Sequence, residues 1–73
     1  MTEKIHILNG TIYNEKQELV CGAIVKISEI DPDTKKSKFL GYTITDINGY
    51  YLIQIEAFSD KFYELAIFPP LNY

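Results

Sequence analysis

Thr45-Asp46-Ile47-Asn48-Gly49-Tyr50-Tyr51-Leu52-Ile53-Gln54-Ile55 is the stretch that decides the fold of this chain. Asparagine and glycine both tolerate the positive φ of a tight turn, so Asn48-Gly49 predicts a turn and a β-hairpin around it. The residues that follow alternate in polarity, as strand residues on opposite faces do. We expect the core face to carry Tyr51, Ile53 and Ile55, and the opposite face to carry Tyr50, Leu52, Gln54 and Glu56.

Strand-like patterns also occupy the rest of the chain. They cover residues 5–13, 23–30, 38–45, 50–57 and 62–68, and no helical period is sustained between them. Aromatic and β-branched residues gather inside these runs, as they do on pleated, half-buried surfaces. The sequence therefore predicts an all-β fold in a single domain, residues 1–73.

Glycines and polar clusters mark the expected turns. Gly10 lies inside the first run, where a glycine indicates a bulge or the close approach of another backbone. A turn is predicted over residues 14–18, and Gly22 precedes the second run. In that run Ala23, Val25 and Ile27 share one face. The third run does not reveal whether its Leu40 face or its Phe39 face is the inner one.

Composition limits the possible functions. The chain has 73 residues and a formal charge of −3, which opposes binding to nucleic acid. Cys21 is the only cysteine, so an internal disulfide and a cysteine-rich zinc site are excluded. No stretch reaches the length and apolar character of a membrane span or a signal peptide, so we expect a soluble chain without membrane insertion.

Candidate catalytic residues are scarce. His6 is the only histidine, and no nucleophile motif accompanies it. We therefore expect no enzyme activity and no cofactor. Alternate carboxylate and amide oxygens give weak calcium candidates in two loops. These are Asp31 and Asp33 in one loop, and Asp46 and Asn48 in the other, where turn chemistry already accounts for the residues.

Two segments resemble carboxypeptidase regulatory-like domains, which are transthyretin-like β-sandwiches. Leu8-Asn9-Gly10-Thr11-Ile12-Tyr13-Asn14 with Gly22-Ala23-Ile24-Val25-Lys26-Ile27 is similar to the opening pattern of that family. Residues 45–55 resemble its Thr-Asp-x-x-Gly-x-aromatic segment, and residues 63–67 with Asn72-Tyr73 resemble its closing strand. The resemblance implies a small antiparallel Greek-key-type β-sandwich and an accessory rather than catalytic role, often in secreted or cell-envelope proteins.

The resemblance also implies that the final strand of the family is missing here, which would leave a sheet edge open. Open edges and apolar outer faces favour pairing with another chain. We therefore expect a structural or interaction module that forms a homo-oligomer or binds another protein. The alternative is a small carbohydrate- or peptide-binding domain that uses surface tyrosines and loop carboxylates. Candidate interaction residues are Tyr13, Ile24, Tyr50, Leu52, Phe62 and Phe68, and the turn-forming residues are Gly10, Gly22, Asp46, Asn48 and Gly49.

Overall fold

The structure is a computed structural model that describes residues 3–70, and this part consists of strands and loops without a helix. The five strands are β1 (Glu3–Thr11), β2 (Ile24–Ile30), β3 (Ser37–Ile44), β4 (Tyr50–Phe58) and β5 (Phe62–Phe68). Each strand coincides with a run predicted from the sequence to within two residues at either end. The all-β prediction is confirmed.

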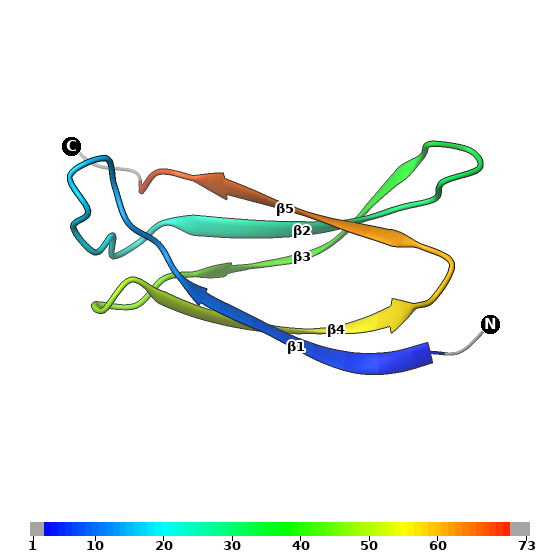
Figure 1. Ribbon diagram of the computed structural model, residues 1–73, viewed down its shortest axis with the longest axis horizontal. Helices are drawn as coiled ribbons and strands as arrows, with labels where there is room; N and C mark the ends of the chain where they lie inside the picture. Colours follow the sequence, from blue (N-terminus) through cyan, green and yellow to red (C-terminus); the bar gives the residue numbers. More distant parts are fainter. Residues whose placement is uncertain (1–2, 71–73) are drawn as a thin grey trace.

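The strands form two antiparallel sheets with the arrangement of a sandwich. One sheet has the order β1-β4, and the other has the order β3-β2-β5. In Figure 1, β5, β2 and β3 cross the upper part of the view while β4 and β1 cross the lower part, and loops join the strands at both ends. Consecutive strands β3 and β4 therefore belong to different sheets.

The predicted hairpin is wrong, although its turn is correct. Gly49 has a φ of 72° and its N–H donates to the Asp46 carbonyl at 2.9 Å, so the chain does turn at Asn48-Gly49. Thr45 stays with the three-stranded sheet, because its hydroxyl accepts the Ala23 N–H and donates to the Val20 carbonyl. The next strand instead pairs with β1. The turn is thus an arch between sheets.

The core lies between the two sheets and is small. Its buried apolar side chains are Ala23, Val25, Ile27, Tyr51 and Ile55. The predicted core face of β4 is confirmed by Tyr51 and Ile55, with Ile53 half-buried, and the face that Ala23 shares with Val25 and Ile27 of β2 is the inner one. A core of this size leaves many large apolar side chains in contact with solvent.

A glycine at position 10 is explained by the close packing of a side chain, not by a bulge or by the approach of another backbone. The register of β1 with β4 is continuous, and Gly10 pairs with Tyr51. A Cβ atom on Gly10 would lie 2.9 Å from the Tyr51 ring and hydroxyl, which cover it. The bulge is found between β2 and β3 instead, at Ile27/Ser28, where Leu40 is the extra residue.

The second sheet is covered unevenly. Leu65 and Ile67 of β5 pair with Ile27 and Val25 of β2 and so point to the same inner face. Nevertheless they are 40% and 50% exposed. The arch holds β4 against β3, and the complete burial of Val25 and Ile27 indicates that the two-stranded sheet covers β2. Among residues 3–70 the end of β4 reaches the start of β5, where the Tyr63 hydroxyl accepts the Phe58 N–H, but the inner face of β5 is open at Leu65 and Ile67.

Candidate interaction surfaces

The outer face of the three-stranded sheet holds the largest cluster of exposed apolar side chains. Ile24 pairs with Ile44 on one side and with Phe68 on the other, so the three side chains lie in one row. Beside them an open depression of about 420 Å³ has an apolar lining. We call this surface the outer apolar face, and it consists of Ile24, Phe39, Tyr42, Ile44 and Phe68, with Lys26 among them.

The bulge in β3 assembles this surface. Regular alternation would place Phe39 on the face opposite to Tyr42 and Ile44. The extra residue, Leu40, reverses the alternation, so Phe39 pairs with Ser28 and joins the outer side. Leu40 turns inward and lines a cavity beside Ile55 of β4. The inner face of this run could not be decided from alternation alone, because the bulge places Leu40 inward and both Phe39 and Tyr42 outward.

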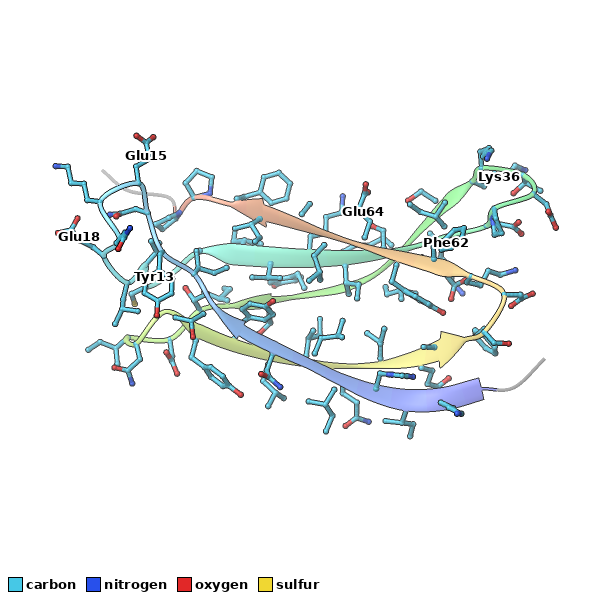
Figure 2. The ribbon with its side chains drawn as sticks, in the orientation of Figure 1. Tyr13, Glu15, Glu18, Lys36, Phe62 and Glu64 are labelled. Atoms are coloured by element: carbon cyan, nitrogen blue, oxygen red, sulfur yellow. The ribbon has the colours of Figure 1, made fainter. Side chains whose placement is uncertain are left out.

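Two charged residues accompany the outer apolar face. The Lys26 ammonium lies 5.6 Å from the centre of the Phe39 ring, within the range of a cation–π contact. Glu64 of β5 pairs with Ser28, next to Lys26 on the same outer face, and Figure 2 shows its side chain on β5. No salt bridge among the described residues joins Lys26 to Glu64.

The predicted interaction residues do not form one surface. Ile24 and Phe68 lie on the outer apolar face. Phe62 lies on the same side but at the other end of β5, near Lys36 (Figure 2). Tyr50 and Leu52 lie on the outer face of β4. Tyr13 is in the loop after β1, where it forms an isolated bridge with Leu19.

Three members of the outer apolar face were missed by sequence reasoning. Phe39, Tyr42 and Ile44 are each more than half exposed. Phe39 and Tyr42 are three positions apart in the sequence, so regular strand alternation would place them on opposite faces. Gly41, a glycine inside a strand, is the signal that could have indicated a bulge there.

A second apolar surface lies on the outside of the two-stranded sheet. Ile7 pairs with Gln54 and Ile5 with Glu56, so the two isoleucines stand opposite polar residues. They are 57% and 64% exposed. Leu52 and Tyr50 of β4 lie on the same surface opposite Asn9 and Thr11, so each apolar side chain stands opposite a polar one, unlike the row on the outer apolar face.

The carboxylates considered for calcium are occupied by their own turns. Asp46 Oδ1 accepts the N–H groups of Asn48 and Tyr50 at 2.8 and 3.0 Å. Asp31 Oδ1 likewise accepts the N–H groups of Asp33 and Thr34. Because the two loops join different strand pairs, these residues do not come together. Among residues 3–70 no group of three or more acidic, histidine or cysteine side chains could hold a metal ion.

A small polar network joins the end of β2 to the start of β5. Tyr63 donates to Glu29 at 3.1 Å and accepts the Phe58 N–H at 2.8 Å. Desolvation raises the pKa of the Tyr63 phenol, and the neighbouring Glu29 adds to this effect. The Lys61 ammonium lies 3.4 Å from Asp31. These contacts fix the loop geometry at this end and leave no reactive group unpaired within them.

His6 has no arrangement around it that suggests catalysis. It lies with Lys4, Ala57, Phe58 and Ser59 around an open cavity of about 480 Å³ at one end of the two-stranded sheet. A cysteine thiol would be the other candidate nucleophile, but Cys21 is exposed in the loop between β1 and β2 and does not line this cavity.

Comparison with known proteins gives no matching family, no matching curated protein and no matching solved structure. The resemblance to carboxypeptidase regulatory-like domains consequently stays a prediction. The described part of the chain also contains no helix that could cross a membrane. Function must therefore be inferred from the surfaces of the molecule itself.

Proposed function

We propose that this chain is a non-catalytic structural module that associates with a second copy of itself through the outer apolar face. The observation that supports this proposal most directly is the joint exposure of Phe39, Tyr42, Ile44 and Phe68 on one sheet face. Contiguous apolar patches of this kind are typical of protein interfaces. Face-to-face packing of two such sheets would remove these side chains from water.

The surface area of the molecule supports an interface of ordinary size. The chain exposes 5612 Å², whereas a folded monomer of 8.4 kDa is expected to expose about 4600 Å². The excess is close to the roughly 800 Å² that each partner contributes to a standard interface. Its radius of gyration, 13.8 Å, likewise exceeds the roughly 11 Å expected for this length. Self-association would bury part of the surface that this elongated shape exposes.

Charge supports a second copy as the partner. The outer apolar face carries one cation, Lys26, and Glu64 lies on the same side of the sheet. In a two-fold interface, a contact between one residue of the first copy and a different residue of the second occurs twice, once in each direction. With the axis between β2 and β5, Lys26 of each copy would approach Glu64 of its partner. The same patch would then contribute an apolar centre and two charge pairs.

Analytical ultracentrifugation over a series of concentrations tests this proposal. We expect the weight-average mass to rise toward that of a dimer by about 0.1 mM, where modest interfaces are populated. Phe68→Glu should shift the dissociation constant at least about tenfold, because it buries an unpaired charge. Ile47→Glu is the matched control, since Ile47 is 82% exposed at the tip of the arch.

A charge exchange separates this interface from unspecific apolar contact. Lys26→Glu and Glu64→Lys should each weaken the dimer, while the double variant should restore part of the loss. A wild-type chain that stays monomeric at about 0.1 mM would contradict the proposal. So would a dimer that Phe68→Glu and Ile47→Glu weaken to the same extent.

A further inference from the structure

The free edge of β1 presents a regular row of unpaired backbone groups. The Ile12 N–H donates to the Gly49 carbonyl at 2.8 Å, at the point where β1 meets β4. In an antiparallel pair the residues that bond to the partner strand alternate with residues that point away from it. Even-numbered residues of β1 therefore face β4. Consequently the N–H and C=O groups of Ile5, Ile7, Asn9 and Thr11 point outward from the sheet.

This edge lacks the features that block strand addition at the edges of the other sheet. β3 carries a bulge and is preceded by lysines 35 and 36. β5 ends directly at Pro69-Pro70. β1 is nine residues long and pairs without a shift of register. Bulges, prolines and lysines are common means of protecting an edge, and between Ile5 and Thr11 β1 has none of them.

A strand added to this edge would lie over the open inner face of β5. β4 contacts β3, and the two-stranded sheet buries Val25 and Ile27 of β2 but leaves Leu65 and Ile67 of β5 exposed. We therefore expect the next strand position beside β1 to lie above these two residues. Leu65 and Ile67 of β5 form the apolar surface beneath the position of the added strand. Side chains of the added strand that point inward would therefore meet a leucine and an isoleucine.

The position of the added strand is basic at the end that lies beside the start of β1. Lys4 and His6 are on the inner side of β1, around the cavity of about 480 Å³ described above. Among the described residues the lining of that cavity includes no carboxylate. An inward-pointing side chain of the added strand beside Lys4 would be its cross-strand neighbour. A carboxylate is the side chain that complements that position.

We propose that the flank formed by the free edge of β1 and the inner face of β5 binds an extended polypeptide segment of another protein by strand addition. The segment runs antiparallel to β1, places apolar side chains inward at every second position, and carries an acidic residue toward its C-terminal end, beside Lys4. This inference rests on the proposed interaction role of the chain, but it uses a surface separate from the outer apolar face.

A second copy of β1 fits this place less well than such a segment. In an antiparallel pair of two β1 strands centred on Ile7, Lys4 of the second copy would stand opposite Gly10 of the first. Its ammonium would then point toward the apolar part of the flank, where no carboxylate is present to pair with it. Charge therefore favours a different segment, and self-pairing becomes one outcome of the test.

A synthetic nine-residue peptide, Thr-Val-Thr-Leu-Thr-Val-Thr-Glu-Thr, tests the inference on the wild-type chain. It should bind, as followed by isothermal titration calorimetry. It should also slow amide hydrogen exchange at Ile5, Ile7, Asn9 and Thr11, with little change at the even-numbered positions. Two control peptides have the same length. One has the same composition in an order without alternation, and the other has lysine in place of glutamate. Each should bind at least about tenfold more weakly.

Two variants of the chain locate the site. Ile7→Pro removes an outward N–H while leaving the hydrogen bonds to β4 intact, and Leu65→Lys places a charge on the floor of the flank. Both should weaken binding about tenfold or more. Phe68→Glu, which lies on the outer apolar face, should leave peptide binding unchanged. This variant distinguishes failure of the flank from failure of the proposed self-association.

The same measurements can overturn the inference. Absence of binding at about 1 mM peptide, or exchange slowed at strands other than β1, would exclude strand addition at this edge. Equal binding of the alternating and non-alternating peptides would do the same. Slowed exchange at the odd-numbered residues of β1 in the chain alone, rising with its concentration, would identify the occupant as a second copy instead.

Discussion

Strands β2 and β5 are neighbours in one sheet, and their inner faces differ completely. Val25 and Ile27 of β2 are fully buried, whereas their cross-strand partners Ile67 and Leu65 of β5 are about half exposed. The two strands have the same alternation of apolar residues, and register places the four side chains on one face. Burial here is therefore set by the layer opposite. The sheet formed by β1 and β4 covers β2 and stops before β5.

The sharpest test of this comparison is truncation of paired side chains. Ile27→Ala should lower the free energy of unfolding by about 2–5 kcal/mol, because it leaves a cavity in packed surroundings. Leu65→Ala should lower it by less than about 1 kcal/mol, because water already reaches that side chain. Urea denaturation of the wild type and both variants measures the difference.

Ile27→Val provides a milder variant if Ile27→Ala does not fold, with an expected loss of about 1 kcal/mol. Equal losses for Ile27→Ala and Leu65→Ala would contradict the comparison. They would mean that the inner face of β5 is covered in solution, for example by a second copy that pairs at the free edge of β1. In that case the loss for Leu65→Ala should depend on protein concentration only if a second copy is the cover.

A substitution at Gly10 should disturb the packing of the two-stranded sheet that covers β2. A Cβ atom at this position would lie 2.9 Å from the Tyr51 ring, which must then shift away from the core. Gly10→Ala should lower the free energy of unfolding by about 1–3 kcal/mol, as overpacking commonly does. Gly41→Ala is the matched control, because no heavy atom lies within 4 Å of its added Cβ atom. We expect it to be neutral or slightly stabilising in urea denaturation.

Strand positions and inner faces could be predicted from the sequence because both depend on local alternation. The five runs, the turn at Asn48-Gly49 and the inward set Val25, Ile27 and Tyr51 all follow from a period of two and from turn chemistry. Which strands pair could not be predicted in this way. The arch after Thr45 depends on hydrogen bonds to Val20 and Ala23, more than twenty residues away in sequence.

The candidate surfaces were less predictable, for two physical reasons. A single extra residue, Leu40, moves Phe39 to the side of Tyr42 and Ile44, and periodicity alone cannot show such a shift. In addition, the exposure of a strand depends on the layer opposite it, so Leu65 and Ile67 form the floor of an open flank although they share a face with the buried Val25 and Ile27. Of the predicted interaction residues, only Ile24 and Phe68 lie on the outer apolar face.

The smallest expected effect concerns the polar tie between the two compared strands. Asp31 follows β2, Lys61 precedes β5, and their side chains lie 3.4 Å apart. The N–H groups of Asp33 and Thr34, followed by Lys61, hold the pKa of the Asp31 carboxyl below its ordinary value of 3.8. The folded state therefore favours the ionised form. Its contribution to stability is present above pH 3.8 and disappears as the pH falls through the lowered pKa of the folded state.

Asp31→Asn should accordingly reduce the melting temperature slightly at pH 7, by less than Gly10→Ala does, because the tie is at the surface. The difference between wild type and variant should shrink as the pH falls from about 5 toward 2. Asp33→Asn is the matched control in the same loop. Melting curves that stay parallel over this range would show that Asp31 contributes nothing through its charge. A difference at pH 7 larger than that of Gly10→Ala would show that this tie, rather than apolar cover, holds β5 to the fold.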